Sequence, residues 1–238
     1  MKVLIRAGLL GLTLALFVAS QAKAADVSSA GSDNAGMKIV RESTEWCDMR
    51  VFEATQEDLP RVLLIGDSIS GGYFQGVANE LKGKAYVGRL GTSKSLGDPA
   101  LFDEIRLMLS QYKFAVIHFN NGLHGWGYTE DDYRAAFPKM IAVLKEKAPG
   151  AKLIWATTTT VRTGKPKFEQ FDPRNERVKV RNRIAAEFIT KEGIPVNDLY
   201  AMEENHPEHS SDGVHFKAEA AAAQAKQVAK YIADALGK

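Results

Sequence analysis

Ser68 lies in the short turn that follows the apolar run 62–65, and this placement is the first sign of chemistry in the sequence. Four apolar, mostly branched residues in a row predict a buried strand. A serine at the carboxyl end of such a strand lies where α/β proteins bind ligands, in the crevice outside the strand ends. We therefore interpret Ser68 as a candidate nucleophile.

A base for this serine is available near the C-terminus. A hydroxyl is a weak nucleophile until its proton is accepted, usually by a histidine that a carboxylate orients. Asp212 and His215 are three residues apart, and in a tight turn this spacing lets the carboxylate reach the Nδ1 proton and leaves Nε2 for the serine. Two simpler interpretations stay open: Ser68 as a helix N-cap, and Asp212-x-x-His215 as a capping turn for the last helix.

Acyl transfer also needs hydrogen-bond donors where negative charge develops on a carbonyl oxygen. The candidates are the backbone N–H of Ser68, a backbone N–H at Gly91 and the side-chain amide of Asn121. Each follows one of the first three predicted strands. These strands are neighbours in the simplest sheet order, so their loops open onto one crevice.

Strand and helix signals alternate five times from Pro60 onward. Strands are predicted over 62–65, 85–90, 114–119, 152–157 and 194–199, and helices over 72–82, 99–112, 129–147, 175–192 and 216–236. The alternation predicts an α/β fold in which a five-stranded parallel sheet has helices on both faces. Because crossovers are right-handed, the flavodoxin-like order 2-1-3-4-5 is the simplest arrangement.

The first 24 residues have the features of a secretory signal peptide. Lys2 and Arg6 precede the apolar run 7–19, which is shorter than the ~20 residues of a membrane span. The Ala-Lys-Ala sequence at 22–24 fits a cleavage site. We expect cleavage after Ala24 and a periplasmic or secreted protein with no stable membrane anchor; an uncleaved anchor is the alternative.

The mature chain is expected to carry one domain. Residues 25–59 are read as a flexible tether followed by an extension without a clear period, and residues 60–238 as the domain. Removal of the leader leaves 28 basic against 29 acidic residues, a net charge of about −1. This balance argues against a nucleic-acid partner. Cys47 is the only cysteine, so the fold must be stable without an intramolecular disulfide.

The stretches that carry these candidates resemble, taken together, the motifs of the SGNH (GDSL-type) hydrolases. The matching features are the sequence 66–69 (Gly-Asp-Ser-Ile), a glycine after the second strand, an asparagine after the third and a terminal Asp-x-x-His. The resemblance extends from Arg61 to the C-terminus. It implies a three-layer α/β/α fold and ester hydrolysis, with no metal or organic cofactor.

The resemblance also implies a role for each site residue. Ser68 would be the nucleophile, His215 the base and Asp212 the residue that orients the base. The oxyanion hole would consist of the Ser68 amide, Gly91 and Asn121.

The third motif departs from the family form, and the second leaves an alternative residue. The third is usually Gly-x-Asn-Asp, whereas residues 119–122 read Phe-Asn-Asn-Gly. We align Asn121 with the oxyanion asparagine, and Asn120 is the alternative or a substrate contact. In the second motif, Gly88 is the alternative to Gly91. The serine turn lacks the final glycine of Gly-x-Ser-x-Gly, which argues against an α/β-hydrolase nucleophile elbow.

Other side chains are candidates for substrate contacts or ligands. His124 could touch the substrate or assist the oxyanion hole, but we favour a loop histidine bonded to backbone. Trp126 could line a sugar or acyl pocket, or pack a lid. Arg162 could bind a substrate carboxylate, although an exposed salt bridge is the commoner case. The spacing of His206 and His209 could hold a metal, but we favour a solvated loop.

The sequence therefore predicts an exported serine esterase that acts through an acyl-enzyme. A short acetyl-type ester, of a small molecule or a carbohydrate, is the expected substrate. The same triad could instead transfer the acyl group to a sugar hydroxyl, which requires the exclusion of water. A third hypothesis is a binding module in which the altered loop after the third strand has lost catalysis.

Overall fold

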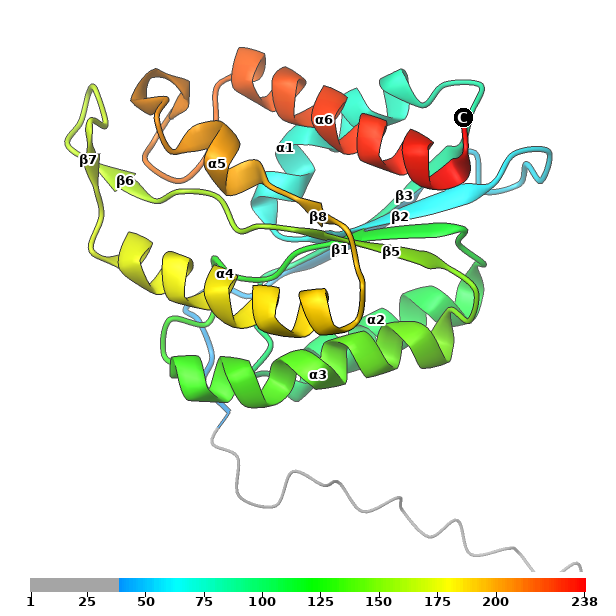
Figure 1. Cartoon of the computed structure of the whole chain (residues 1–238), viewed down its shortest axis with the longest axis horizontal. Coiled ribbons are helices and arrows are strands. Elements are labelled where there is room, and N and C mark those ends of the chain that lie inside the picture. The colour runs from blue at the N-terminus through cyan, green and yellow to red at the C-terminus, as the bar shows by residue number, and fades with distance from the viewer. Residues whose placement is uncertain (1–38) are drawn as a thin grey trace, which may run out of the picture. The chain divides into compact units, whose positions relative to one another are not determined.

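The structure is a computed structural model that describes residues 39–238 (Figure 1). The predicted signal peptide and the predicted tether over 25–37 lie outside the described residues. Within residues 39–238, no helix is both long enough and apolar enough to cross a membrane.

A six-stranded sheet of order β1-β3-β2-β4-β5-β8 forms the centre of the fold. The strands are β1 (Cys47–Val51), β2 (Arg61–Gly66), β3 (Tyr86–Thr92), β4 (Val116–Phe119), β5 (Lys152–Ala156) and β8 (Val196–Asn197). All run parallel except β1, which pairs antiparallel with β3 at the edge. The prediction of five strands missed β1, which lies in the stretch that was read as an extension.

Helices cover both faces of the sheet (Figure 1). One layer holds α1 (Ser68–Glu80), α5 (Leu199–Glu203) and α6 (Ala218–Leu236), and the other holds α2 (Pro99–Gln111), α3 (Glu130–Lys147) and α4 (Arg174–Lys191). A two-stranded hairpin, β6 (Arg162–Thr163) with β7 (Gln170–Phe171), and the short 3₁₀ helix η1 (Pro207–His209) complete the described elements. The predicted α/β architecture with helices on both faces is confirmed.

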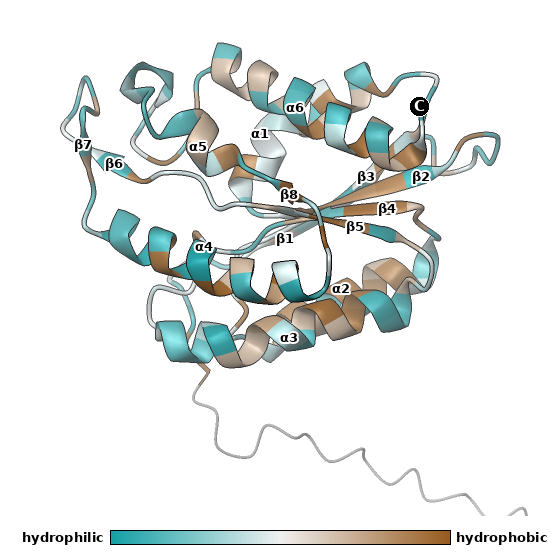
Figure 2. Cartoon of the chain, in the orientation of Figure 1, coloured by the Kyte–Doolittle hydropathy of each residue, from teal (hydrophilic) through white to brown (hydrophobic). Residues whose placement is uncertain are grey.

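The core explains why β2 is a continuous apolar run. Successive side chains of a strand point to opposite faces, and here both faces are covered. Val62 and Leu64 pack with α1 and α6, whereas Leu63 and Ile65 pack with α2, α3 and α4. Figure 2 shows the resulting pattern: hydrophobic colour on the inner strands and on the helix faces turned toward them, and hydrophilic colour on the outer helix faces.

Candidate active site

Ser68, His215 and Asp212 form one hydrogen-bonded chain. Ser68 Oγ lies 2.9 Å from His215 Nε2, and His215 Nδ1 lies 2.7 Å from Asp212 Oδ2. An Nδ1–H that donates to the carboxylate leaves Nε2 unprotonated, which is the form that can accept the serine proton. The fold thus brings together, from the β2–α1 junction and the loop before α6, the three side chains that were predicted as a triad.

Helix α1 begins at Ser68 because Asp67 is its N-cap. The Asp67 side chain accepts a hydrogen bond from the Ile69 N–H at 2.9 Å. The helix therefore starts four residues before the predicted Gly72, and the Ser68 hydroxyl does not serve as the cap. The Ser68 N–H lies in the first turn, where backbone donors lack intrahelical acceptors and favour negative charge.

A buried arginine that was not among the predicted site residues supports this turn. Arg89 of β3 is 5% exposed. Its guanidinium donates to the Asp67 carbonyl at 2.9 Å, to Ser70 Oγ at 3.2 Å and to the Asp48 carboxylate at 2.7 Å. Burial lowers the pKa of Arg89 from its ordinary value, and the nearby Asp48 carboxylate offsets part of this shift. An arginine at an inner position of a predicted strand was the signal that could have identified it.

Gly91 lies within β3 and makes room for that arginine. A Cβ at this position would overlap the Arg89 guanidinium. Two backbone hydrogen bonds of 3.1 Å join the strands, one at each end of the β1–β3 pairing. Because hydrogen-bonded and non-hydrogen-bonded residue pairs alternate along an antiparallel ladder, these two bonds determine which residue pairs between them are hydrogen-bonded. Gly91 and Asp48 form a bonded pair, so the Gly91 N–H is directed to β1. This register does not support the predicted place of Gly91 in the oxyanion hole.

The two asparagines after β4 have different partners. Asn120 Nδ2 donates to the Ala156 carbonyl at 2.7 Å and to Thr158 Oγ1 at 3.1 Å, so both of its amide hydrogens are used. Asn121 Oδ1 accepts from the Leu96 N–H at 3.1 Å, and its Nδ2 donates to the Lys94 carbonyl at 2.8 Å. These bonds orient the Asn121 amide and leave one hydrogen on Nδ2 for another acceptor.

Hydrogen bonds from residues of its own turn hold Asp212 in place. Its Oδ1 accepts from the N–H groups of Val214 at 2.9 Å and His215 at 2.8 Å. Burial raises the pKa of Asp212, but the hydrogen bonds from the His215 backbone and ring outweigh it and lower the pKa to about 2. The carboxylate therefore stays ionised beside the imidazole. Asp212 does not cap α6, since the N-cap Lys217 has no side-chain cap bond.

Arg162 supports the same turn from its other side. Its backbone N–H donates to the Gly213 carbonyl at 2.7 Å. A Cβ on Gly213, whose φ is +102°, would overlap the Arg162 carbonyl. The Arg162 guanidinium is buried and donates to the carbonyls of Phe168, Glu203 and Glu204. It is therefore neither the exposed salt bridge nor the free carboxylate-binding group that the sequence suggested.

His124 and Trp126, in the loop after β4, are held by residues from other segments of the chain. His124 Nδ1 lies 2.9 Å from Glu42 Oε2, and Glu42 Oε1 accepts from the Gly125 N–H at 2.8 Å. The ring partner is thus a carboxylate of the N-terminal extension and not the loop backbone. Trp126 lies 4.7–5.8 Å from three guanidinium carbons, those of Arg174, Arg177 and Arg181. These cation–π contacts anchor the loop on α4.

Comparison with known proteins gives matches at the level of structure. No protein-family profile and no curated sequence matches the chain. Three solved structures serve as examples. The acetyl xylan esterase AlAXEase has a TM-score of 0.58 and 17% identity, covering 72% of this chain and 99% of that one. The M. smegmatis aryl esterase has 0.59 and 13%, covering 74% and 99%. A GDSL-like lipase from Bacteroides thetaiotaomicron has 0.51 and 19%, covering 72% and 88%.

The chain therefore has the fold of the SGNH/GDSL-type hydrolases, as its motifs predicted.

Proposed function

We propose that the protein is a serine ester hydrolase of the SGNH type. The observation that carries the proposal is the continuous chain from Ser68 Oγ through His215 to Asp212, with distances of 2.9 and 2.7 Å. The hydrogen-bonded triad lies at the carboxyl end of β2. The fold around it is shared with solved structures that are named as esterases and lipases. Each triad atom has the partner that acyl transfer requires.

The geometry supports the following sequence of steps. His215 Nε2 accepts the Ser68 proton as Oγ attacks the ester carbonyl carbon. The oxyanion that forms accepts hydrogen bonds from the Ser68 N–H and the remaining Asn121 amide hydrogen. The intermediate then collapses, His215 returns the proton to the leaving alcohol, and an acyl-enzyme is left. A water molecule deprotonated by His215 releases the acid. Asp212 keeps the imidazole oriented throughout.

Hydrolysis is favoured over acyl transfer by the openness of the site. The side chains of Asp212 and His215 are each 47% exposed, so water reaches the base directly. Acyl transfer to a sugar requires that water be excluded. We propose a short acetyl-type ester of a small molecule or a carbohydrate as the substrate; that AlAXEase is an acetyl xylan esterase supports this choice. The signal peptide predicted over residues 1–24 supports a site of action outside the cytoplasm.

The test is ester turnover by the wild type and by Ser68→Ala. Release of p-nitrophenol from acetyl and octanoyl esters should be fast for acetyl in the wild type and lost in the variant. A preference for octanoyl would overturn the short-acyl proposal. Ser68-dependent turnover that appears only when a sugar acceptor is added would make the protein a transferase. If no ester panel gives Ser68-dependent turnover with or without an acceptor, the binding-module hypothesis replaces both.

A further inference from the structure

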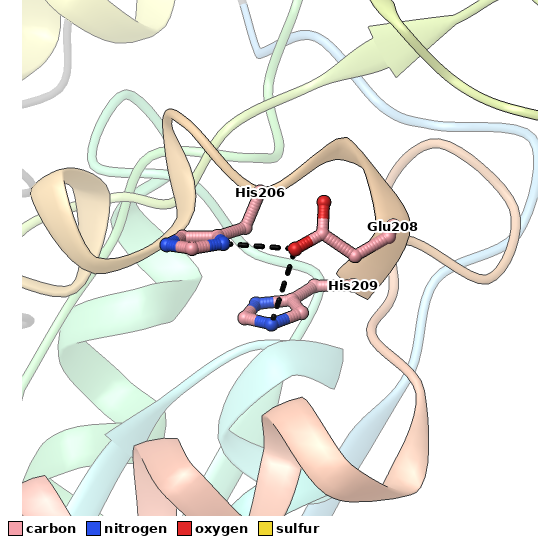
Figure 3. A group of neighbouring side chains, drawn as sticks. All are labelled: His206, Glu208 and His209. Atoms are coloured by element: carbon pink, nitrogen blue, oxygen red, sulfur yellow. Dashed lines mark hydrogen bonds and ion pairs between the residues drawn. The ribbon is translucent and has the colours of Figure 1, made fainter.

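A second cluster of chemically active side chains lies on and beside η1 (Figure 3). His206, Glu208 and His209 each offer one ligand atom, and these atoms lie within 4.8 Å of one another. Glu208 Oε1 lies beside the two rings, 2.9 Å from His206 Nδ1 and 3.8 Å from His209 Nε2. The imidazoles are stacked with centroids 4.6 Å apart and an interplanar angle of 12°. Two nitrogens and one oxygen therefore lie close together at one place on the surface.

A buried carboxylate orients one of these histidines. Glu203 is fully buried, its Oε2 lies 2.9 Å from His209 Nδ1, and its Oε1 accepts from Gln224 Nε2 at 2.8 Å. Because a buried carboxylate requires donors, it favours the tautomer with the proton on Nδ1 and the lone pair on Nε2. A carboxylate behind a histidine is the arrangement that orients and strengthens histidine ligands in metal sites.

We propose that His206, Glu208 and His209 bind a divalent transition metal ion, for which Zn²⁺ is the probe. Two imidazoles and one carboxylate suit Zn²⁺, whereas Mg²⁺ and Ca²⁺ prefer oxygen ligands alone. The 3.8 Å from Glu208 Oε1 to His209 Nε2 is close to the ~3.4 Å between two tetrahedral ligands at ~2.1 Å from an ion. The three side chains are partly exposed, so water completes the coordination. The proposal departs from the solvated loop that the sequence favoured for these residues.

The cluster is connected to the catalytic turn by backbone hydrogen bonds. The Lys217 N–H donates to the His209 carbonyl at 2.8 Å, and the Ser211 N–H donates to the His215 carbonyl at 2.9 Å. An isolated β-bridge joins Ser210 and Phe216 between these bonds. An ion that orders η1 therefore stabilises the base of the loop that carries His215, and the melting temperature should rise with Zn²⁺ concentration.

Equilibrium dialysis of the metal-free protein against Zn²⁺, with excess Mg²⁺ present, tests the site. The wild type should bind one equivalent. The double variant His206→Gln/His209→Gln should bind at least about ten-fold more weakly. Two matched controls should bind as the wild type does: His124→Gln, whose ring also pairs with a surface glutamate, and His215→Gln, which excludes binding at the triad.

Glu203→Gln supplies a second arm, because it keeps all three ligands. Its affinity for Zn²⁺ should fall by about 10–100-fold, and circular dichroism without metal checks that it is folded. Three results would overturn the proposal: equal Zn²⁺ binding by the wild type and the double variant, no Zn²⁺ binding by the wild type, or loss of binding only in His215→Gln. None of these readouts depends on ester turnover, so the metal site and the proposed activity can fail separately.

Discussion

The two turns that carry the triad are held in opposite ways. The turn before α1 is buried, and the Arg89 guanidinium bonds to Asp67 and Ser70 within it. The turn with Asp212 and His215 leaves both side chains 47% exposed, and hydrogen bonds between near neighbours shape it. The position of the nucleophile is thus tied to the stability of the core, whereas the position of the base depends on hydrogen bonds within its own turn and on the backbone bond from Arg162 to Gly213.

This difference predicts which substitutions unfold the protein and which only inactivate it. In the buried turn, a polar atom that loses its hydrogen-bond partner stays desolvated, because water cannot reach it, and the folded state is destabilised. In the exposed turn, solvent replaces most lost contacts, so activity falls while stability is largely kept. The predictions below separate the two regions by measuring activity and unfolding on the same variants.

Ser68→Ala is expected to have the largest effect on activity. Its kcat should fall by about 10⁴–10⁶-fold, because no other group can attack the ester. The free energy of unfolding should change by less than about 0.5 kcal/mol, since Asp67 and not Ser68 caps α1. Ester turnover and urea titration measure the two quantities.

Ser70→Ala is the matched control for that serine. It removes the buried hydroxyl that accepts from Arg89 Nε and donates to the Asp67 carbonyl. It should lose about 1–3 kcal/mol of stability while activity stays within about ten-fold of the wild type. Equal loss of activity in the two alanine variants would contradict the division of roles within this turn.

Asp212→Asn is expected to reduce kcat by about 10⁴-fold. The amide can donate to His215 Nδ1 and so favour the wrong tautomer, with the proton on Nε2. Because the side chain is half exposed, the urea midpoint should barely move. The account of the exposed turn is contradicted if the variant unfolds much more easily but retains its rate.

Arg89→Met should lower the free energy of unfolding by about 3–5 kcal/mol, because it leaves buried polar atoms without their donor. Arg50→Met is the control. Arg50 Nε also pairs with Asp48, at 2.9 Å, but its side chain is 62% exposed, and its loss should cost less than about 1 kcal/mol. Similar urea midpoints for the two variants would show that burial does not decide the difference.

His118 extends the comparison into the core beneath the site. It is fully buried, Asn197 Nδ2 lies 3.0 Å from its Nε2, and burial lowers its pKa to about 3. An unfolded histidine titrates near ~6.5, so below that pH the unfolded state binds the proton and the folded state does not. Stability should be complete above pH ~6.5 and fall by up to ~1.4 kcal/mol per pH unit toward pH 3.

Urea unfolding between pH 3 and 7 checks this slope. The variant His118→Gln should be less stable at neutral pH, because it disturbs a buried hydrogen bond, but its stability should fall less steeply with acid. The same acid slope in the variant and the wild type would assign the acid sensitivity to other groups.

The sequence predicted the parts of the fold that depend on local patterns. The apolar run of β2 and the spacing of Asp212 and His215 required no knowledge of distant residues. The helix predicted from residue 129 begins with such a local pattern: Thr129 Oγ1 accepts from the Asp132 N–H at 3.1 Å, and the Asp132 carboxylate accepts from the Thr129 N–H at 2.8 Å. These features act within a few residues of the chain, where periodicity and capping rules apply.

The features that were missed depend on contacts between distant segments. Strand β1 carries the polar residues Asp48 and Arg50, and only its pairing with β3 makes it a strand. The orientation of Asn121 depends on backbone atoms of Lys94 and Leu96, about 25 residues away in the chain. Gly91 fitted the family motif, but in the structure its missing side chain makes room for a buried arginine.

Mass spectrometry of the acylated protein tests the central claim most directly. The wild type would be mixed with p-nitrophenyl acetate, quenched in acid during the burst and digested. The account predicts an added acetyl group on the peptide that contains Ser68, no such adduct in Ser68→Ala, and slower formation in Asp212→Asn. An acetyl group on another residue, together with undiminished turnover by Ser68→Ala, would contradict it.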